Sequence, residues 1–144
     1  MENTHTVIIE PLQRKHLEQA ILLLQNMSAF LPPKDSYDEI WEAFVTQPNV
    51  HSVVAIENEE VVGYGAVIIE TKVRGGKMAH LEDIVSHPHK RNKGIGKIIV
   101  NALYEIAKIN KCYKVSLQCK QDNIPFYEKC EYKVSETAMQ RFIE

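Results

Sequence analysis

A chain of 144 residues is long enough to bury a substantial core, and we expect residues 1–144 to form a single domain. Charged residues make up 25% of the chain and the formal net charge is −2, which excludes a broad basic surface for nucleic acid or anionic lipid. No apolar run approaches the ~20 residues that span a bilayer, and residues 1–5 show no signal-peptide pattern. We therefore expect a cytoplasmic protein without a nucleic-acid or membrane partner.

The cysteine and histidine content argues against a metal site. The chain has three cysteines, an odd number whose spacings match no zinc template, so we expect free thiols at Cys112, Cys119 and Cys130. His87 and His89 flank a proline, but no carboxylate or cysteine is spaced to complete a ligand set with them. We expect a polar turn at this position and no bound metal.

The first third of the chain predicts one strand followed by two helices. Residues 7–9 are β-branched and form a strand stopped by Pro11, while residues 16–27 carry apolar side chains at helical spacing. Ser36 and Glu39 have the spacing of a capping box, in which each side chain bonds the other residue's backbone N–H group. We expect the second helix to begin there.

The middle of the chain predicts a hairpin and a third strand. Residues 52–57 and 61–69 are β-branched runs joined by the polar residues 58–60, which is typical of a β-hairpin. The third strand follows a pair of glycines and includes the apolar-rich residues 79–85, before a proline interrupts it.

The last third predicts a long helix and several shorter elements. From Ile95 apolar residues recur at positions i, i+3, i+4 and i+7, which is the stripe of a helix packed on one face. Residues 112–119 are expected to form a buried strand, and Asp122 to cap a short helix that ends at Lys129. Two terminal strands complete the prediction, at 133–136 and 138–143. This order of elements predicts an α/β protein with a mixed sheet rather than a doubly wound one.

Residues 91–96 join the third strand to the long helix and read Arg-Asn-Lys-Gly-Ile-Gly. The glycines lie at the helix N-terminus, where unpaired N–H groups and the helix dipole favour an anion that can approach closely in the absence of Cβ atoms. A P-loop needs Lys-Ser/Thr after its last glycine, but Lys97 and Ile98 follow here. A dinucleotide fold needs a third glycine and a later acidic residue, and neither is present. The loop predicts a local phosphate site of another type.

This Arg-x-x-Gly-x-Gly pattern resembles the acyl-CoA pyrophosphate loop of the GNAT superfamily of N-acetyltransferases. Four blocks in order, at residues 82–85, 93–97, 112–114 and 123–130, together resemble the glucosamine-6-phosphate N-acetyltransferases. The resemblance implies the GNAT fold, a mixed twisted sheet flanked by helices, in a homodimer that exchanges its C-terminal strands. It also implies transfer of acetyl from acetyl-CoA to the amine of glucosamine 6-phosphate, on the route to UDP-N-acetylglucosamine.

The resemblance places acetyl-CoA at this loop and at the elements beside it. The implied ligands are Ile84, Val85, Ser86, Arg91, Asn92, Lys93, Gly94, Ile95, Gly96, Lys97, Asn123 and Tyr127. A backbone N–H at Ile84 or Val85 would polarise the acetyl carbonyl. The Tyr127 hydroxyl would lie near the CoA sulfur, where a phenol can donate a hydrogen bond or a proton. The alternative is that Tyr127 only packs the last helix.

The resemblance also implies an acceptor site. Its expected residues are Ser28, Lys72, Glu82, Asp83, Tyr113, Lys114, Gln118 and Arg141. Consecutive Glu82 and Asp83 would point to opposite faces of a strand, so a local bulge is needed for both to reach one sugar. The alternatives are two solvated acids beside a sheet and, for Lys72 and Arg74, a solvated hairpin tip.

Two residues depart from the family pattern. Gln118 stands where an acid is common, and Glu131 stands where a glycine is usual, so a turn that needs positive φ would be strained there. We expect no acyl-enzyme, because Cys112 and Cys119 have no partner that would lower a thiol pKa. The other interpretations are a GNAT enzyme for another amine, such as a polyamine or a protein N-terminus, and a non-catalytic acyl-CoA-binding module.

Overall fold

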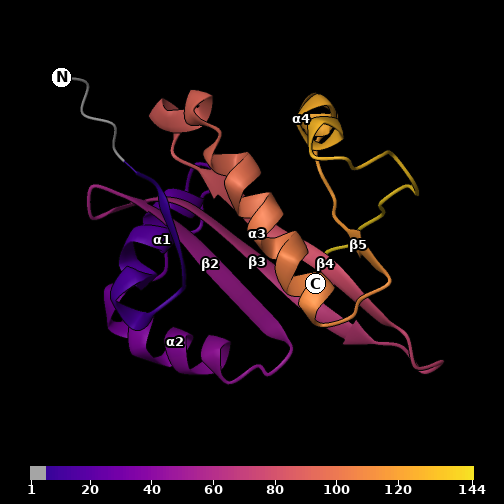
Figure 1. The fold of residues 1–144 in the computed structure, drawn as a ribbon. Helices are drawn as coiled ribbons and strands as arrows, with labels where there is room; N and C mark the ends of the chain where they lie inside the picture. The colour runs from indigo at the N-terminus through magenta and orange to yellow at the C-terminus, as the bar shows by residue number, and fades with distance from the viewer. Residues whose placement is uncertain (1–5) are drawn as a thin grey trace.

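The computed structural model describes residues 6–144, except that the side chains of residues 91–93 are outside the description. It is a five-stranded sheet with helices on both faces (Figure 1). The strands are β1 (Ile8–Pro11), β2 (Val50–Glu57), β3 (Glu60–Thr71), β4 (Lys77–Ser86) and β5 (Lys114–Ser116). The helices are α1 (Leu17–Leu24), α2 (Tyr37–Val45), α3 (Ile95–Ile109) and α4 (Ile124–Lys129). Four 3-10 turns precede them, namely η1 (Arg14–His16), η2 (Lys34–Ser36), η3 (Pro88–Lys93) and η4 (Gln121–Asn123).

The sheet is mixed, as the sequence predicts. Its strand order is β1-β2-β3-β4-β5, in which the first four strands are antiparallel neighbours. Strand β5 then pairs with β4 in parallel, after the chain has crossed over through α3. A parallel neighbour requires such a crossover, because a tight turn can only reverse the chain.

The predicted hairpin between β2 and β3 is confirmed, with a shorter connection than expected. Glu57 pairs with Glu60, so only Asn58 and Glu59 form the turn. Both have positive φ, at 54° and 63°, as the two central residues of a type I′ turn do. Of the expected loop residues 58–60, Glu60 is thus already the first residue of β3.

Helices on opposite faces of the sheet enclose separate cores. The predicted stripe of α3 packs on one face, where its most buried side chains are Ile95, Ile99, Val100, Leu103 and Ala107. Helix α1 packs on the other face through Ala20 and Leu23, and α2 packs on α1 rather than on the sheet. A Cβ on Gly65 of β3 would fall 2.7 Å from Cγ2 of Ile99, so this glycine lets α3 approach the sheet closely.

Two predicted helix caps are wrong. The Ser36 hydroxyl donates a hydrogen bond to the Pro33 carbonyl at 2.6 Å and caps nothing, because η2 already holds the Ser36 backbone in a helical conformation. The predicted capping box with Glu39 therefore does not form. Asp122 lies inside η4, and Asn123 takes the N-cap position of α4 without a side-chain capping bond.

The predicted strands after Cys112 are shorter or missing. Strand β5 covers only three residues, and within the described chain neither 133–136 nor 138–143 pairs with another strand. A β-prone segment becomes a strand only where a partner backbone is available. The tail instead leaves large apolar side chains exposed, among them Val134, Met139, Phe142 and Ile143. Within residues 6–144, no helix is both long and apolar enough to span a membrane.

Candidate functional site

Strand β4 contains the predicted bulge, located at its two acidic residues. Ala66 pairs with Glu82 and Tyr64 with Val85, so two residues of β4, Asp83 among them, lie opposite the single residue between Tyr64 and Ala66. Asp83 has a φ of 55°, which Asp tolerates better than most residues. The extra residue resets the alternation of side chains along the strand.

The bulge places Glu82 and Val85 on the same face of the sheet, which an unbroken strand could not do. Their partners Ala66 and Tyr64 both belong to the core beneath α1, so this is the α1 face. Asp83 lies near Tyr64, whose pKa rises to about 12 because of burial and, to a smaller extent, the Asp83 charge. Both acidic residues are exposed. Their charges are thus available to a ligand beside this face.

Beyond the bulge, β4 has a free outer edge. Strand β5 pairs with β4 only at Met78, Ala79 and His80. Among the described residues no strand pairs with the outer edge of β4 from Leu81 to Ser86. The two strands therefore part, and backbone groups on that edge can bind an extended ligand. This is the stretch that holds the predicted ligands Ile84, Val85 and Ser86.

The predicted anion loop lies at the N-terminus of α3. Gly94 has a φ of 71°, and a Cβ there would meet nothing within 4 Å, so glycine is favoured by backbone conformation. The Ile95 side chain is fully buried and its backbone N–H lies in the first turn of α3, where an N–H has no intrahelical acceptor, while Lys97 is exposed. The side chains of the other predicted ligands lie outside the described part of the chain, namely Arg91, Asn92 and Lys93.

Gly96 has a different reason to be glycine. A Cβ on it would fall 3.0 Å from Cζ of Phe126, so the first turn of α3 lies directly against α4. Phe126 in turn packs edge-on against Tyr127, with 4.9 Å between ring centroids. The glycine loop and the predicted catalytic tyrosine are therefore joined through one aromatic side chain.

Tyr127 is half-buried between aromatic rings. The Tyr132 ring centroid lies 6.2 Å from that of Tyr127, and the Tyr132 hydroxyl is buried without a hydrogen-bond partner among the described residues. Burial raises the pKa of Tyr127 and of Tyr132 to about 12. Tyr127 therefore stays protonated at neutral pH and is a hydrogen-bond donor.

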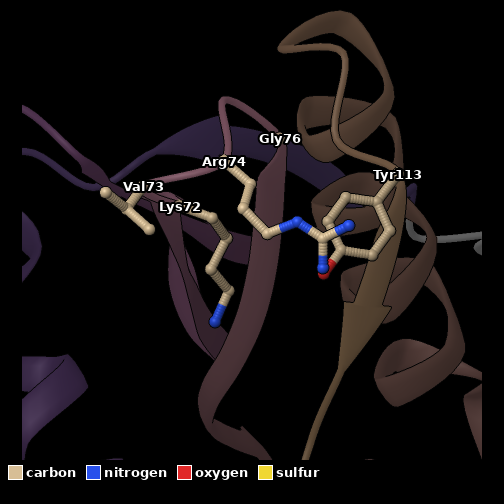
Figure 2. A pocket seen from close by; sticks show the side chains of 5 residues that line it. All are labelled: Lys72, Val73, Arg74, Gly76 and Tyr113. Carbon is tan, nitrogen blue, oxygen red and sulfur yellow. The ribbon is translucent and has the colours of Figure 1, made fainter.

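The tip of the β3–β4 hairpin forms a hollow of about 610 Å³ with the start of β5. It is lined by Lys72, Val73, Arg74, Gly76 and Tyr113. Figure 2 shows the Arg74 guanidinium reaching toward the Tyr113 ring, while the Lys72 ammonium points away from it. Gly76 lies against the same ring, because a Cβ there would be 3.3 Å from two of its carbons. Two cations and an exposed aromatic ring suit a phosphorylated polar ligand.

Lys72 is already engaged by a carboxylate. Its Nζ lies 3.0 Å from Oε1 of Glu70, and the same oxygen lies 2.9 Å from Nε2 of His80. Hydrogen bonds from His80 and Lys72 lower the pKa of Glu70. Arg74 is therefore the stronger candidate of the two for binding an anion.

The remaining predicted acceptor residues are exposed and dispersed. Lys114 Nζ lies 5.9 Å from the centroid of the Tyr113 ring, so these two neighbours belong to the same patch. Ser28 follows α1 in a loop that the Gln25 side chain holds by accepting from Phe30 N and donating to Phe30 O. Gln118 lies where the chain leaves β5, and Arg141 lies in the C-terminal tail. A single subunit does not bring all of them together.

Two residues of this region, Arg74 and Tyr64, do not stand out in the sequence as site residues. The sequence predicts that Arg74 is a solvated tip residue, and no linear pattern indicates that it lines a hollow together with Tyr113. Tyr64 does not stand out either, because it pairs with Val85 and comes near Asp83 only through the bulge, which a sequence does not reveal. Among residues 6–144 with described side chains, no group of three or more His, Cys, Asp or Glu could hold a metal ion.

Comparison with known proteins agrees with this geometry. Residues 18–132 match the model of the Acetyltransferase (GNAT) family. A glucosamine 6-phosphate N-acetyltransferase of Candida albicans is 35% identical over 104 residues, covering 69% of this chain and 70% of that protein. One from Arabidopsis thaliana is 32% identical over 115 residues, covering 76% and 77%.

Solved structures extend the likeness over nearly the whole chain. The crystal structure of glucosamine-6-phosphate N-acetyltransferase from Arabidopsis thaliana superposes with a TM-score of 0.90 at 28% identity, covering 96% of this chain and 99% of that one. An aminoglycoside N-acetyltransferase in complex with CoA shares the fold, with a TM-score of 0.83 at 16% identity. The sheet with its parted strands and glycine loop is thus that of an acyltransferase. The chain belongs to the GNAT family of acetyltransferases.

Proposed function

We propose that this protein transfers acetyl from acetyl-CoA to the amine of glucosamine 6-phosphate. The observation that carries the proposal is the bulge in β4, which places the exposed residues Glu82 and Asp83 beside the free outer edge of that strand. The relatives that bear this activity in their names support the choice of acceptor.

The donor lies along the free edge of β4. Its pyrophosphate meets the backbone N–H groups at Gly94, Ile95 and Gly96, with Arg91, Asn92, Lys93 and Lys97 beside them, as the helix dipole favours. Its extended arm follows the backbone of Ile84, Val85 and Ser86, and Asn123 binds it from the N-cap of α4, where its side chain makes no capping bond. One backbone N–H of β4 polarises the thioester carbonyl.

The chemistry is a direct attack in a ternary complex. The neutral amine adds to the acetyl carbonyl, the tetrahedral oxyanion collapses, the C–S bond breaks, and the amine nitrogen loses a proton. Carboxylates at Glu82 and Asp83 bind the acceptor as its ammonium ion, which releases one proton to solvent before the neutral amine attacks. No acyl-enzyme is involved, and burial raises the pKa of the Cys130 thiol, which makes it a poor nucleophile.

Tyr127 stabilises the departing thiolate. A thiol has an ordinary pKa near 8.5, whereas that of Tyr127 is about 12, so complete proton transfer from the phenol to the thiolate is uphill. This large difference in pKa favours a hydrogen bond from the Tyr127 hydroxyl to the sulfur. The sulfur gains its proton in a later step. The sequence allows Tyr127 to donate either a hydrogen bond or a proton to the CoA sulfur, and the hydrogen bond fits the burial of Tyr127 better.

The sugar phosphate lies in the hollow at the hairpin tip. Arg74 is its principal ligand, with Lys72, Tyr113 and Lys114 beside it, and Ser28 and Gln118 contact the sugar. Arg141 reaches this site from the partner subunit of a homodimer in which the C-terminal segments are exchanged, which would also cover their exposed apolar side chains. The protein acts in the cytoplasm.

Release of free CoA thiol from acetyl-CoA tests the proposal. Glucosamine 6-phosphate, glucosamine, spermine and a short peptide should be compared as acceptors at equal concentration. We expect turnover to require the phosphorylated sugar, and Arg74→Ala to raise the KM for that sugar with little change in the KM for acetyl-CoA. Turnover only with another amine would overturn the acceptor, and binding of acetyl-CoA without any turnover would indicate a non-catalytic module.

A further inference from the structure

Glu57 carries a carboxylate into the protein interior. It is the last residue of β2 and is 2% exposed, in a position where a lone charge would be strongly unfavourable. Lys90 of η3 donates a hydrogen bond from Nζ to Oε1 of Glu57. The Glu57 side chain is 1% exposed and that of Lys90 25%, so the contact is largely shielded from water.

Further contacts fix the same turn to the same hairpin. The His87 backbone N–H donates to the Val62 carbonyl at 2.7 Å, while the turn itself is closed by a bond from Lys90 N–H to the His87 carbonyl at 2.9 Å. His87 Nε2 also lies 3.8 Å from Oε1 of Glu60. The segment that leads into Gly94 is therefore attached to the β2–β3 hairpin at several points.

Stability alone does not account for this buried pair. Replacing a buried ion pair with well-packed apolar residues is often neutral or stabilising, because two charges must lose their water. A charge-assisted hydrogen bond is instead directional, and it fixes the position of both partners. The pair joins residues 33 apart in the chain, so its geometric effect is to set where η3 lies relative to the sheet.

We propose that Glu57 is a positioning residue for acyl-CoA. Acting through Lys90, it holds η3 so that the backbone N–H groups at Gly94 and Gly96 meet the pyrophosphate of the donor. Glu57 itself touches no substrate. The proposal rests on the proposed function, in which the glycine loop binds the pyrophosphate.

A comparison of two acetyl donors distinguishes a positioning role of Glu57 from a general effect on the structure. Acetyl-CoA carries the pyrophosphate, whereas S-acetylpantetheine has the same reacting thioester and arm without it. We expect Lys90→Gln to lower kcat/KM for acetyl-CoA about tenfold, the size expected for a lost charge-assisted hydrogen bond. The value for S-acetylpantetheine should stay within about twofold, and Lys90→Arg should restore most of the loss.

Direct binding provides the second measurement. Titration calorimetry with CoA should show the same weakening of Kd for Lys90→Gln, while the matched control Lys34→Gln, which removes an exposed Lys–Glu pair, should leave it unchanged. If Lys90→Gln does not fold, the double variant Glu57→Gln/Lys90→Gln removes the buried charge and is tested in its place.

The outcomes are distinguishable. An equal loss of kcat/KM with both donors, or an unchanged Kd for CoA, would overturn the positioning role and leave the proposed function intact. A wild-type enzyme that uses both donors equally well would overturn the pyrophosphate loop, and this proposal with it.

Discussion

The ring of Phe126 fills the space that a side chain at position 96 would need, since a Cβ on Gly96 would fall 3.0 Å from its Cζ. Alanine at this position gains about 1 kcal/mol of helix propensity, but the ring must move away. We expect Gly96→Ala to change the free energy of unfolding by less than about 1 kcal/mol while lowering kcat, because Phe126 carries Tyr127 with it. Urea unfolding and initial rates measure the two effects.

The double variant Gly96→Ala/Phe126→Leu serves as the control for this prediction. A smaller side chain at 126 frees the space, so kcat should partly recover relative to Gly96→Ala. A further loss in the double variant would mean that the contact does not transmit the effect.

Asp83 combines a charge with an uncommon backbone conformation. Asp83→Asn removes the charge and keeps a residue that tolerates a φ of 55°, so stability should stay within about 0.5 kcal/mol while kcat/KM for the sugar falls at least tenfold. Asp83→Gly should relieve the backbone and still lose activity. Thermal unfolding and steady-state kinetics test both, and full activity in Asp83→Asn would remove the carboxylate from the reaction.

Tyr127→Phe removes the hydroxyl and keeps the ring. We expect kcat to fall about 10²-fold, because a donor to the departing sulfur acts only as the C–S bond breaks. The Kd for acetyl-CoA should change less than threefold, and the Tm should stay similar because the ring contacts with Phe126 and Tyr132 remain. A matched Tyr132→Phe variant, with wild-type kcat, would show that the effect belongs to Tyr127.

One buried tyrosine, Tyr64, and two half-buried ones, Tyr127 and Tyr132, make the fold sensitive to high pH. Burial raises the pKa values of Tyr64, Tyr127 and Tyr132 from 10.0 to about 12. The folded state thus binds these protons more tightly than the unfolded chain, and their contribution is complete below pH 10 and lost as pH rises toward 12. The free energy of unfolding should fall across this window. In Tyr64→Phe the fall should be shallower, and an identical slope would contradict the assignment.

Glu131 has a φ of 71° in the turn that follows α4. The sequence already suggested strain at this position, and the positive φ confirms the conformation that glycine prefers. We expect Glu131→Gly to stabilise the protein by about 0.5–1 kcal/mol, with Glu131→Asn intermediate. Chemical denaturation measures the change in the free energy of unfolding, and we expect an unchanged m-value. Destabilisation by glycine would instead mean that the Glu131 side chain makes a favourable contact.

Patterns local in sequence predicted the region around the site well. The strand, loop and helix from residue 79 to 109 follow from apolar periodicity and the glycine pair, whereas the bulge is expected because the family resemblance places both Glu82 and Asp83 at one sugar. The role of Gly96 did not follow, because a sequence does not distinguish a glycine needed for its backbone angle from one needed for close contact. Contacts across the chain, such as Glu57 with Lys90, also leave no local pattern.

The predictions of two C-terminal strands were wrong for a related reason. Residues 133–143 carry β-prone side chains, but strand formation depends on a partner backbone that composition does not specify. Ser36 failed as a cap because a 3-10 turn had already made its backbone helical, which a spacing rule does not detect. The strand error comes from a partner backbone that is missing among the described residues outside the segment, and the cap error comes from a local turn, η2, that includes Ser36 itself.

The short pairing of β5 also determines where the native state opens first. Three residue pairs hold β5 to β4, and they form only after the long crossover is complete, whereas the antiparallel strands close through neighbouring segments. Amide hydrogens from 114 to 132 should therefore exchange by local opening, at lower protection than those of β3. CoA bound between β4 and β5 would contact both strands where they part. We therefore expect CoA to slow amide exchange most strongly in residues 114–132, the segment with the lowest protection in the free protein.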